Sequence, residues 1–256
     1  MSAAVDRSRP TENLSAYDYF LRARQVFTPH AGAFVAEPFL MKALELDPNL
    51  GVAHAMLAHL HCVRFYYDGN RDHLKDALAS AGKALDLEPE EPWPNYAQGI
   101  SLLFLSRFGE AEPYFEKALA LNGNEVRFLA GHAFFLAFMK RTHLALQEID
   151  EALRRDPFAH EWFWDVRGAA LMCAERYSEA IDSFRHLKRP PPWCICYLAV
   201  CHAQVGEMAE AKRMLAKFRE ISPGRTLEEL ISKEPIADPE TAKRLVDAAR
   251  RTEQVD

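Results

Sequence analysis

The sequence has few cysteines and no long apolar run. Five cysteines in 256 residues are an odd and modest number, which fits a reducing compartment better than a disulfide framework. The longest mostly apolar stretch, residues 129–139, contains His132 and is much shorter than the ~20 residues that a membrane-spanning helix needs. Residues 1–15 are polar and lack the apolar core of a secretory signal. We therefore expect a cytoplasmic protein that does not bind membranes and that begins with a disordered segment at residues 1–15.

Clustered positive charge and catalytic motifs are also missing. The chain has 31 lysine and arginine residues against 37 aspartate and glutamate residues, which gives a net charge of −6. Nucleic-acid-binding proteins usually have a clustered basic face, and this sequence has none. It also has no Gly-rich phosphate loop, no nucleophile elbow and no pair of acidic residues in a setting consistent with acid–base catalysis. We therefore expect no nucleic-acid partner, no cofactor and no catalytic residue, and we predict that the protein is not an enzyme.

What the sequence does contain is a repeat. In segment 109–124, the spacing of Ala111, Phe115 and Ala118 places them on one face of a helix, and a glycine-containing turn follows. Related segments place an alanine at positions 36, 77, 111, 145, 180 and 211, which are 41, 34, 34, 35 and 31 residues apart. A period near 34 is typical of arrays of helix-turn-helix units. Because each unit packs against its neighbours, we expect one continuous all-α array.

The recurring positions resemble those of the tetratricopeptide repeat (TPR). In that family, a small residue in the first helix of each repeat lets neighbouring backbones approach closely, and here it is Ala58, Gly99, Ala133, Gly168 and Ala199. The small residues expected seven apart in the second helix include Ala111 with Ala118 and Ala145 with Ala152. The resemblance implies a right-handed superhelical solenoid of about six helix pairs over residues 16–224. Capping helices and a tail are expected at residues 225–256.

Helix boundaries follow from the same pattern. The third and fourth repeats are the most regular, and they predict helices at residues 92–105, 109–121, 125–139 and 143–154. The second repeat has about seven extra residues near 64–70, which we expect to lengthen its first helix or the turn after it. Beyond the array, Thr226 with Glu229 predicts a capping box, and Asp238 before Pro239 predicts an N-cap.

A narrower resemblance is to the TPR tails that follow the catalytic or DNA-binding module in bacterial class III adenylate cyclases and winged-helix regulators. It is carried by A-Y-D-Y-F-L-R-A-R at residues 16–24, by K-A-L-E-L-D-P-N at residues 42–49 and by the irregular C-terminal helices. This resemblance implies a role in bacterial signalling. Because too few residues precede Tyr17 for a cyclase or a winged helix, we do not expect the effector activity of those proteins here.

The TPR resemblance also implies where a partner would bind. In that family, positions two, five and nine of each first helix line the concave face. In repeats three to six, our candidate partner-binding residues at these positions are Trp93, Tyr96, Ile100, Arg127, Phe134, Trp162, Asp165 and Trp193. Aromatic anchors supply most of the energy at binding hot spots, so we expect this face to bind a peptide or helix of a partner protein, in a scaffolding or regulatory role.

Other interpretations of these residues stay open. The tryptophans could pack against the proline turns before them, as in P-E-E-P-W at residues 89–93, and seal the joints between repeats. Alternatively, the aromatic and methionine side chains of repeats three to five could enclose a small apolar ligand, which would make the chain a sensory domain. The degenerate terminal repeats also leave apolar surface that could be capped or paired in a homo-oligomer.

Two clusters of potential metal ligands lack the arrangement of a metal site. Cys194, Cys196, Cys201 and His202 crowd one predicted helix. Residues two apart face different sides of a helix, and no second Cys-x-x-Cys pair completes a tetrahedral site. His54, His59 and His61 lack the i, i+4 pair with an intervening glutamate that marks a zinc protease. The sequence by itself therefore predicts no metal site.

Overall fold

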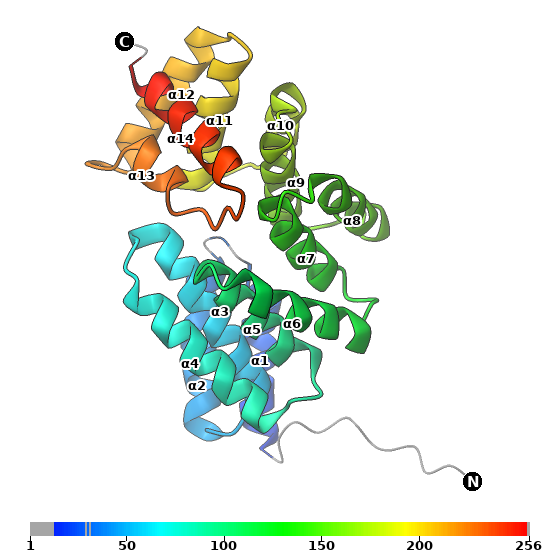
Figure 1. Ribbon diagram of the computed structural model, residues 1–256. Helices are drawn as coiled ribbons and strands as arrows, with labels where there is room; N and C mark the ends of the chain where they lie inside the picture. Colours follow the sequence, from blue (N-terminus) through cyan, green and yellow to red (C-terminus); the bar gives the residue numbers. More distant parts are fainter. Residues whose placement is uncertain (1–12, 29, 31, 255–256) are drawn as a thin grey trace.

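The computed structural model describes residues 13–28, 30 and 32–254, and the regular structure of these residues is α-helical (Figure 1). The N-terminal helices are α1 (Leu14–Val26), α2 (Gly32–Leu46), α3 (Gly51–Asp68), α4 (Asp72–Leu87), α5 (Pro92–Phe104), α6 (Phe108–Leu121) and α7 (Val126–Phe138). The C-terminal helices are α8 (Thr142–Arg155), α9 (Glu161–Cys173), α10 (Tyr177–Phe184), α11 (Pro192–Gln204), α12 (Met208–Ile221), α13 (Leu227–Ile231) and α14 (Pro239–Glu253).

Successive helices form pairs that stack into a solenoid, as the sequence predicts. The pairs are α1 with α2, α3 with α4, α5 with α6, α7 with α8, α9 with α10, and α11 with α12. The observed α5 to α8 begin and end within one residue of the four predicted helices. Agreement is close because the small residues of the repeat are fully buried where the two helices of a pair meet, as Ala111, Ala118, Ala145 and Ala152 are.

The extra residues of the second repeat lengthen α3, which has 18 residues, ends at Asp68 and is capped by Gly69. Gly69 has a φ of 73°, in the left-handed region that glycine adopts at helix ends. The predicted capping box is confirmed, because the Thr226 side chain and the Glu229 side chain each accept a hydrogen bond from the other residue's backbone. Asp238 is the N-cap of α14, as predicted.

The expected disordered segment, residues 1–15, falls largely outside the described residues. The part that is described begins at Asn13, which is the N-cap of α1 and accepts a hydrogen bond from Ala16 N–H at 3.1 Å. Leu14 and Ser15 already belong to that helix. None of the helices among the described residues is long and apolar enough to cross a membrane.

The solenoid turns back on itself, so that its C-terminal end meets its N-terminal half. In Figure 1, the segment between α13 and α14 hangs towards α3. The contact is direct, because Arg225 Nη1 donates a hydrogen bond to the Tyr67 carbonyl oxygen at 2.8 Å, across 158 residues of sequence. The first helices of five pairs, α3, α5, α7, α9 and α11, line one cavity in the interior.

Close backbone approach within a pair predicts a stability difference between two helical glycines. A Cβ on Gly168 of α9 would lie 2.4 Å from Phe184 Cε1, whereas a Cβ on Gly82 of α4 would meet nothing within 4 Å. We expect Gly168→Ala to lower the free energy of unfolding by about 1–3 kcal/mol through overpacking. Gly82→Ala, the control, should be neutral or stabilising by up to about 1 kcal/mol. Urea unfolding of both variants measures this, and equal stabilities would contradict the packing.

Candidate functional site

Six of the eight predicted partner-binding residues meet at one cavity inside the solenoid. The cavity has a volume of about 50 Å³ and is lined by residues of α3, α5, α7, α9 and α11. The six residues are Tyr96, Ile100, Phe134, Trp162, Asp165 and Trp193. The other two, Trp93 and Arg127, lie outside its lining, with Arg127 Cζ 5.0 Å from the centroid of the Trp93 ring.

Most of the cavity wall is buried. Trp193 is 4% exposed and Tyr96 only 2%, while Trp93 is half-buried. The ring of Trp193 packs against α3, with centroids 4.9 Å from Tyr66 and 5.3 Å from Tyr67. This tryptophan therefore contacts a helix on the other side of the interior, in addition to its own repeat.

One oxygen atom of Asp165 contacts both Trp193 on α11 and His30 between α1 and α2. The indole N–H of Trp193 donates to Asp165 Oδ2 at 2.9 Å. The Nε2 atom of His30, in the segment between α1 and α2, lies 3.1 Å from the same oxygen. The His30 ring also packs edge-on to Trp193, with centroids 5.6 Å apart. Asp165, which the sequence predicts to be a partner-binding residue, therefore contacts side chains of its own chain.

The contacts of Asp165 form one polar bridge between elements far apart in the sequence, and those of Glu234 form a second. This residue lies between α13 and α14 and is 7% exposed. The Tyr66 hydroxyl donates to Glu234 Oε2 at 2.7 Å, and the Tyr197 hydroxyl donates to Oε1. The pKa of Glu234 is raised to about 8, mainly by burial; the two tyrosine hydrogen bonds act to lower it, and the nearby Asp165 charge acts to raise it. One carboxyl therefore ties the C-terminal segment to α3 and to α11.

The sequence did not indicate this bridge. Helical periodicity predicts which side chains face inward, and Tyr66 and Tyr197 could have been found on that ground. The partner of Tyr66 lies 168 residues away in a segment without regular structure. A glutamate there is most simply interpreted as a solvated loop residue, so only the three-dimensional arrangement reveals its role.

The cysteines are packing residues. All five are free and buried, and burial raises the pKa of Cys62 and of Cys173 to about 12. A thiol with such a pKa stays protonated and is a poor nucleophile. Among the described residues, the cysteines of α11 do not gather into a group of metal ligands; His61, His73 and Asp76 do.

The buried Glu234 carboxyl makes stability depend on pH. Its pKa is raised above the ordinary 4.5 to about 8 in the folded protein, so its contribution is fully present below pH 4.5 and is lost as the pH rises to about 8. The slope is at most about 1.4 kcal/mol per pH unit. Glu234→Gln should flatten this part of the profile, measured by urea unfolding at several pH values. The exposed control Glu240→Gln should keep the wild-type slope, and an equal slope in Glu234→Gln would contradict the assignment.

Comparisons with known proteins agree with this fold. A family model of the tetratricopeptide repeat matches residues 95–125, which cover most of α5 and all of α6. Over 110 residues the chain is 32% identical to "Putative adenylate cyclase 3" of Rhizobium meliloti, and the match covers 41% of this chain and 19% of that protein. The chain therefore corresponds to a small part of this relative's length.

Three solved structures are similar over most of this chain. The Cut9–Hcn1 complex of the APC/C has a TM-score of 0.62 at 18% identity, covering 96% of this chain and 44% of that one. PilW, a type IV pilus biogenesis factor, has a TM-score of 0.56 at 19% identity, with 84% and 97% covered. A tetratricopeptide repeat protein from Parabacteroides merdae has a TM-score of 0.52 at 14% identity, with 92% and 99% covered. Residues 95–125 therefore match a tetratricopeptide repeat, and the chain has the solenoid fold of tetratricopeptide-repeat proteins.

Proposed function

We propose that the chain is a non-catalytic protein-interaction module whose concave interior binds an apolar peptide or helix of a partner protein. The observation that carries this proposal is the aromatic and aliphatic wall of the interior. The polar bridges of Asp165 and Glu234 connect the elements around this interior. Tyr96, Phe134, Trp162 and Trp193 contribute to this wall, and aromatic side chains are the commonest anchors at protein interfaces. TPR proteins bind protein or peptide partners, which supports the same class of function.

Binding requires the interior to open. A cavity of about 50 Å³ has no room for a peptide, so the N-terminal turn at His30 or the segment at Glu234 must move aside. A hydrogen bond between neutral groups contributes about 0.5–1.5 kcal/mol and one to a charged group about 1.5–3 kcal/mol, a cost that a well-packed partner can offset. The free protein is then mostly closed, and its apparent affinity is lowered by the small fraction that is open.

A small enclosed ligand fits the cavity less well. The lining is apolar apart from a few groups such as Asp165, which favours an apolar ligand in kind. The volume of about 50 Å³ is, however, roughly a third of the ~150 Å³ cavity that takes up benzene. It is also well below the ~300–1,000 Å³ of typical small-molecule sites. A sensory role of this kind would need the same opening as peptide binding.

A scaffolding or regulatory role in bacterial signalling is the setting that we propose. Its support is the match of 110 residues to a protein named as an adenylate cyclase. Because that match covers 19% of the cyclase, the cyclase activity is not carried over to this chain. We propose that the module acts by positioning a partner and performs no chemistry of its own.

Variants that loosen the bridges test the proposal. Peptides selected against the wild-type protein from a displayed library provide the probe. Tyr66→Phe removes one hydroxyl from Glu234, and Asp165→Asn weakens the bridge to Trp193. We expect each to bind a selected peptide roughly 3–10-fold more tightly, as the loss of about one hydrogen bond favours the open state. Isothermal titration calorimetry measures the change.

Two further variants control this experiment. Tyr114→Phe on α6 removes a hydroxyl from a half-buried tyrosine outside the cavity lining, and it should bind like the wild type. Phe134→Ala should weaken binding at least about 10-fold, because this half-buried ring lines the cavity. Unchanged affinity in both bridge variants would contradict the closed interior, and selected peptides that bind equally well without the Phe134 ring would contradict binding at the concave face.

A further inference from the structure

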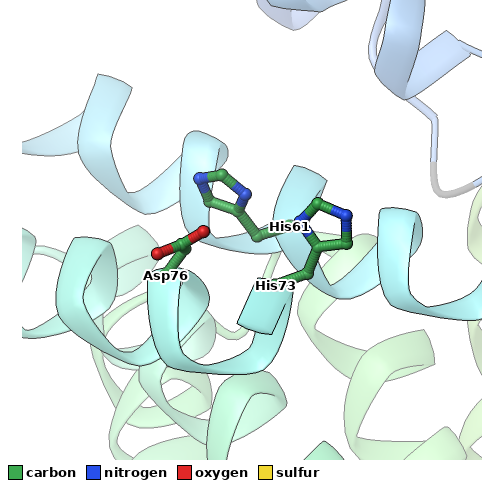
Figure 2. A group of neighbouring side chains, drawn as sticks. All are labelled: His61, His73 and Asp76. Atoms are coloured by element: carbon green, nitrogen blue, oxygen red, sulfur yellow. The ribbon is translucent and has the colours of Figure 1, made fainter. Parts of the chain in front are cut away.

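Three metal-ligating side chains from two helices meet beside the interface of α3 and α4. His61 lies on α3, and His73 and Asp76 lie on the first two turns of α4. One ligand atom from each residue lies within 4.8 Å of the other two (Figure 2). We propose that these residues bind a divalent transition-metal ion such as Zn²⁺, at a site separate from the concave interior.

The set of donors suits such an ion. Two imidazole nitrogens and one carboxylate oxygen are ordinary zinc ligands, with bond lengths of about 2.0–2.2 Å, and a water molecule can complete a tetrahedron. These lengths place neighbouring ligand atoms roughly 3.3 Å apart, so the side chains must close in from the separations in the structure. Asp76 is exposed, and His73 and Asp76 stand three apart on α4, where side chains are neighbours. Rotation of these side chains can supply the movement.

A buried ring nitrogen of His61 points to a missing ligand. His61 Nδ1 is inaccessible to solvent and has no hydrogen-bond partner in the described part of the chain. A buried polar atom without a partner costs about 1–3 kcal/mol, so such atoms call for a specific explanation. The His61 and His73 rings are nearly parallel, at 20°, with centroids 6.1 Å apart. A metal ion bound between the two histidines and Asp76 would give the His61 imidazole a partner.

His73 is already oriented as a metal ligand is. Its Nε2 atom lies 2.9 Å from Asp68 Oδ2, and in Figure 2 the other ring nitrogen lies on the side of His61. Metal-binding histidines usually donate their second ring N–H to a carboxylate, which fixes the ring and strengthens the ligand. Asp68, the last residue of α3, would play that part.

The surrounding charges favour a cation. Arg64 follows His61 by one turn on α3, and its guanidinium donates to Glu37 at 2.6 Å. On the α4 side, Lys75 is paired with Asp72 at 2.7 Å. Two carboxylates lie at the site, since Asp76 belongs to the group of ligands and Asp68 contacts His73, while Lys233 is a cation near Asp68. A bound ion would cross-link the lengthened α3 to α4.

Zinc titration of the untagged, chelator-treated protein tests the site. We expect one Zn²⁺ per chain by calorimetry and a rise in melting temperature with added Zn²⁺, because the ion binds only the folded arrangement. His61→Ala and His73→Ala should abolish both effects. Asp68→Asn should lower the affinity by about 10–100-fold, as loss of a carboxylate behind a ligating histidine does. Co²⁺ in place of Zn²⁺ should give the visible absorption of a tetrahedral site.

Controls separate the site from weak surface binding. His143→Ala removes an exposed histidine on α8 and should leave the stoichiometry and affinity unchanged. Asp76→Asn changes an exposed side chain and keeps the fold testable if a histidine variant is unstable; it should weaken Zn²⁺ binding. The proposal is overturned if wild-type protein binds no Zn²⁺, or if Asp68→Asn and Asp76→Asn both bind it as the wild type does.

Discussion

Two carboxyl groups, the buried Glu234 and the partly buried Asp165, link parts of this solenoid that are far apart in the sequence. Asp165 accepts a hydrogen bond from Trp193 and lies within hydrogen-bonding distance of His30. Glu234 accepts hydrogen bonds from Tyr66 and from Tyr197. A carboxyl group taken out of water is costly unless its hydrogen bonds are replaced, so each of these residues holds its partners in a narrow range of positions.

This closure changes the expected behaviour of a repeat array. In an ordinary solenoid each repeat contacts only its neighbours, and stability is close to a sum of local terms. Here the C-terminal segment contacts α3, on the far side of the interior. Loss of one bridge would therefore affect both ends of the chain. A partner that inserts into the interior would be coupled to the whole array, which is a means of transmitting its presence to an attached or bound protein.

Much of the fold could be predicted from the sequence because it is built from local patterns. The spacing of the alanines gave the helix pairs, and the ends of α5 to α8 were predicted to within one residue. The same pattern brought Tyr96, Phe134 and Trp193 to one cavity. The partner-binding role of these residues remains a prediction.

What could not be predicted are contacts between elements far apart in sequence. Glu234 lies in a segment without a repeat pattern, and His73 follows the irregular turn after α3. Neither the bridge to Tyr66 nor the approach of His73 to His61 has a fixed spacing that a sequence search could recognise. These two contacts depend on the superhelical path and on the length of α3. Both of these are determined by the conformation of many residues together.

The central claim is that polar bridges hold the concave interior closed in the free protein. Small-angle X-ray scattering tests it most directly, by comparing the wild type with the double variant Tyr66→Phe, Asp165→Asn, which removes a hydroxyl donor from one bridge and the carboxylate from the other and leaves the aromatic rings in place. Circular dichroism should give the same helix content for both. The account predicts a larger radius of gyration for the double variant. Identical scattering curves would contradict it, because the interior would then be closed by apolar packing alone.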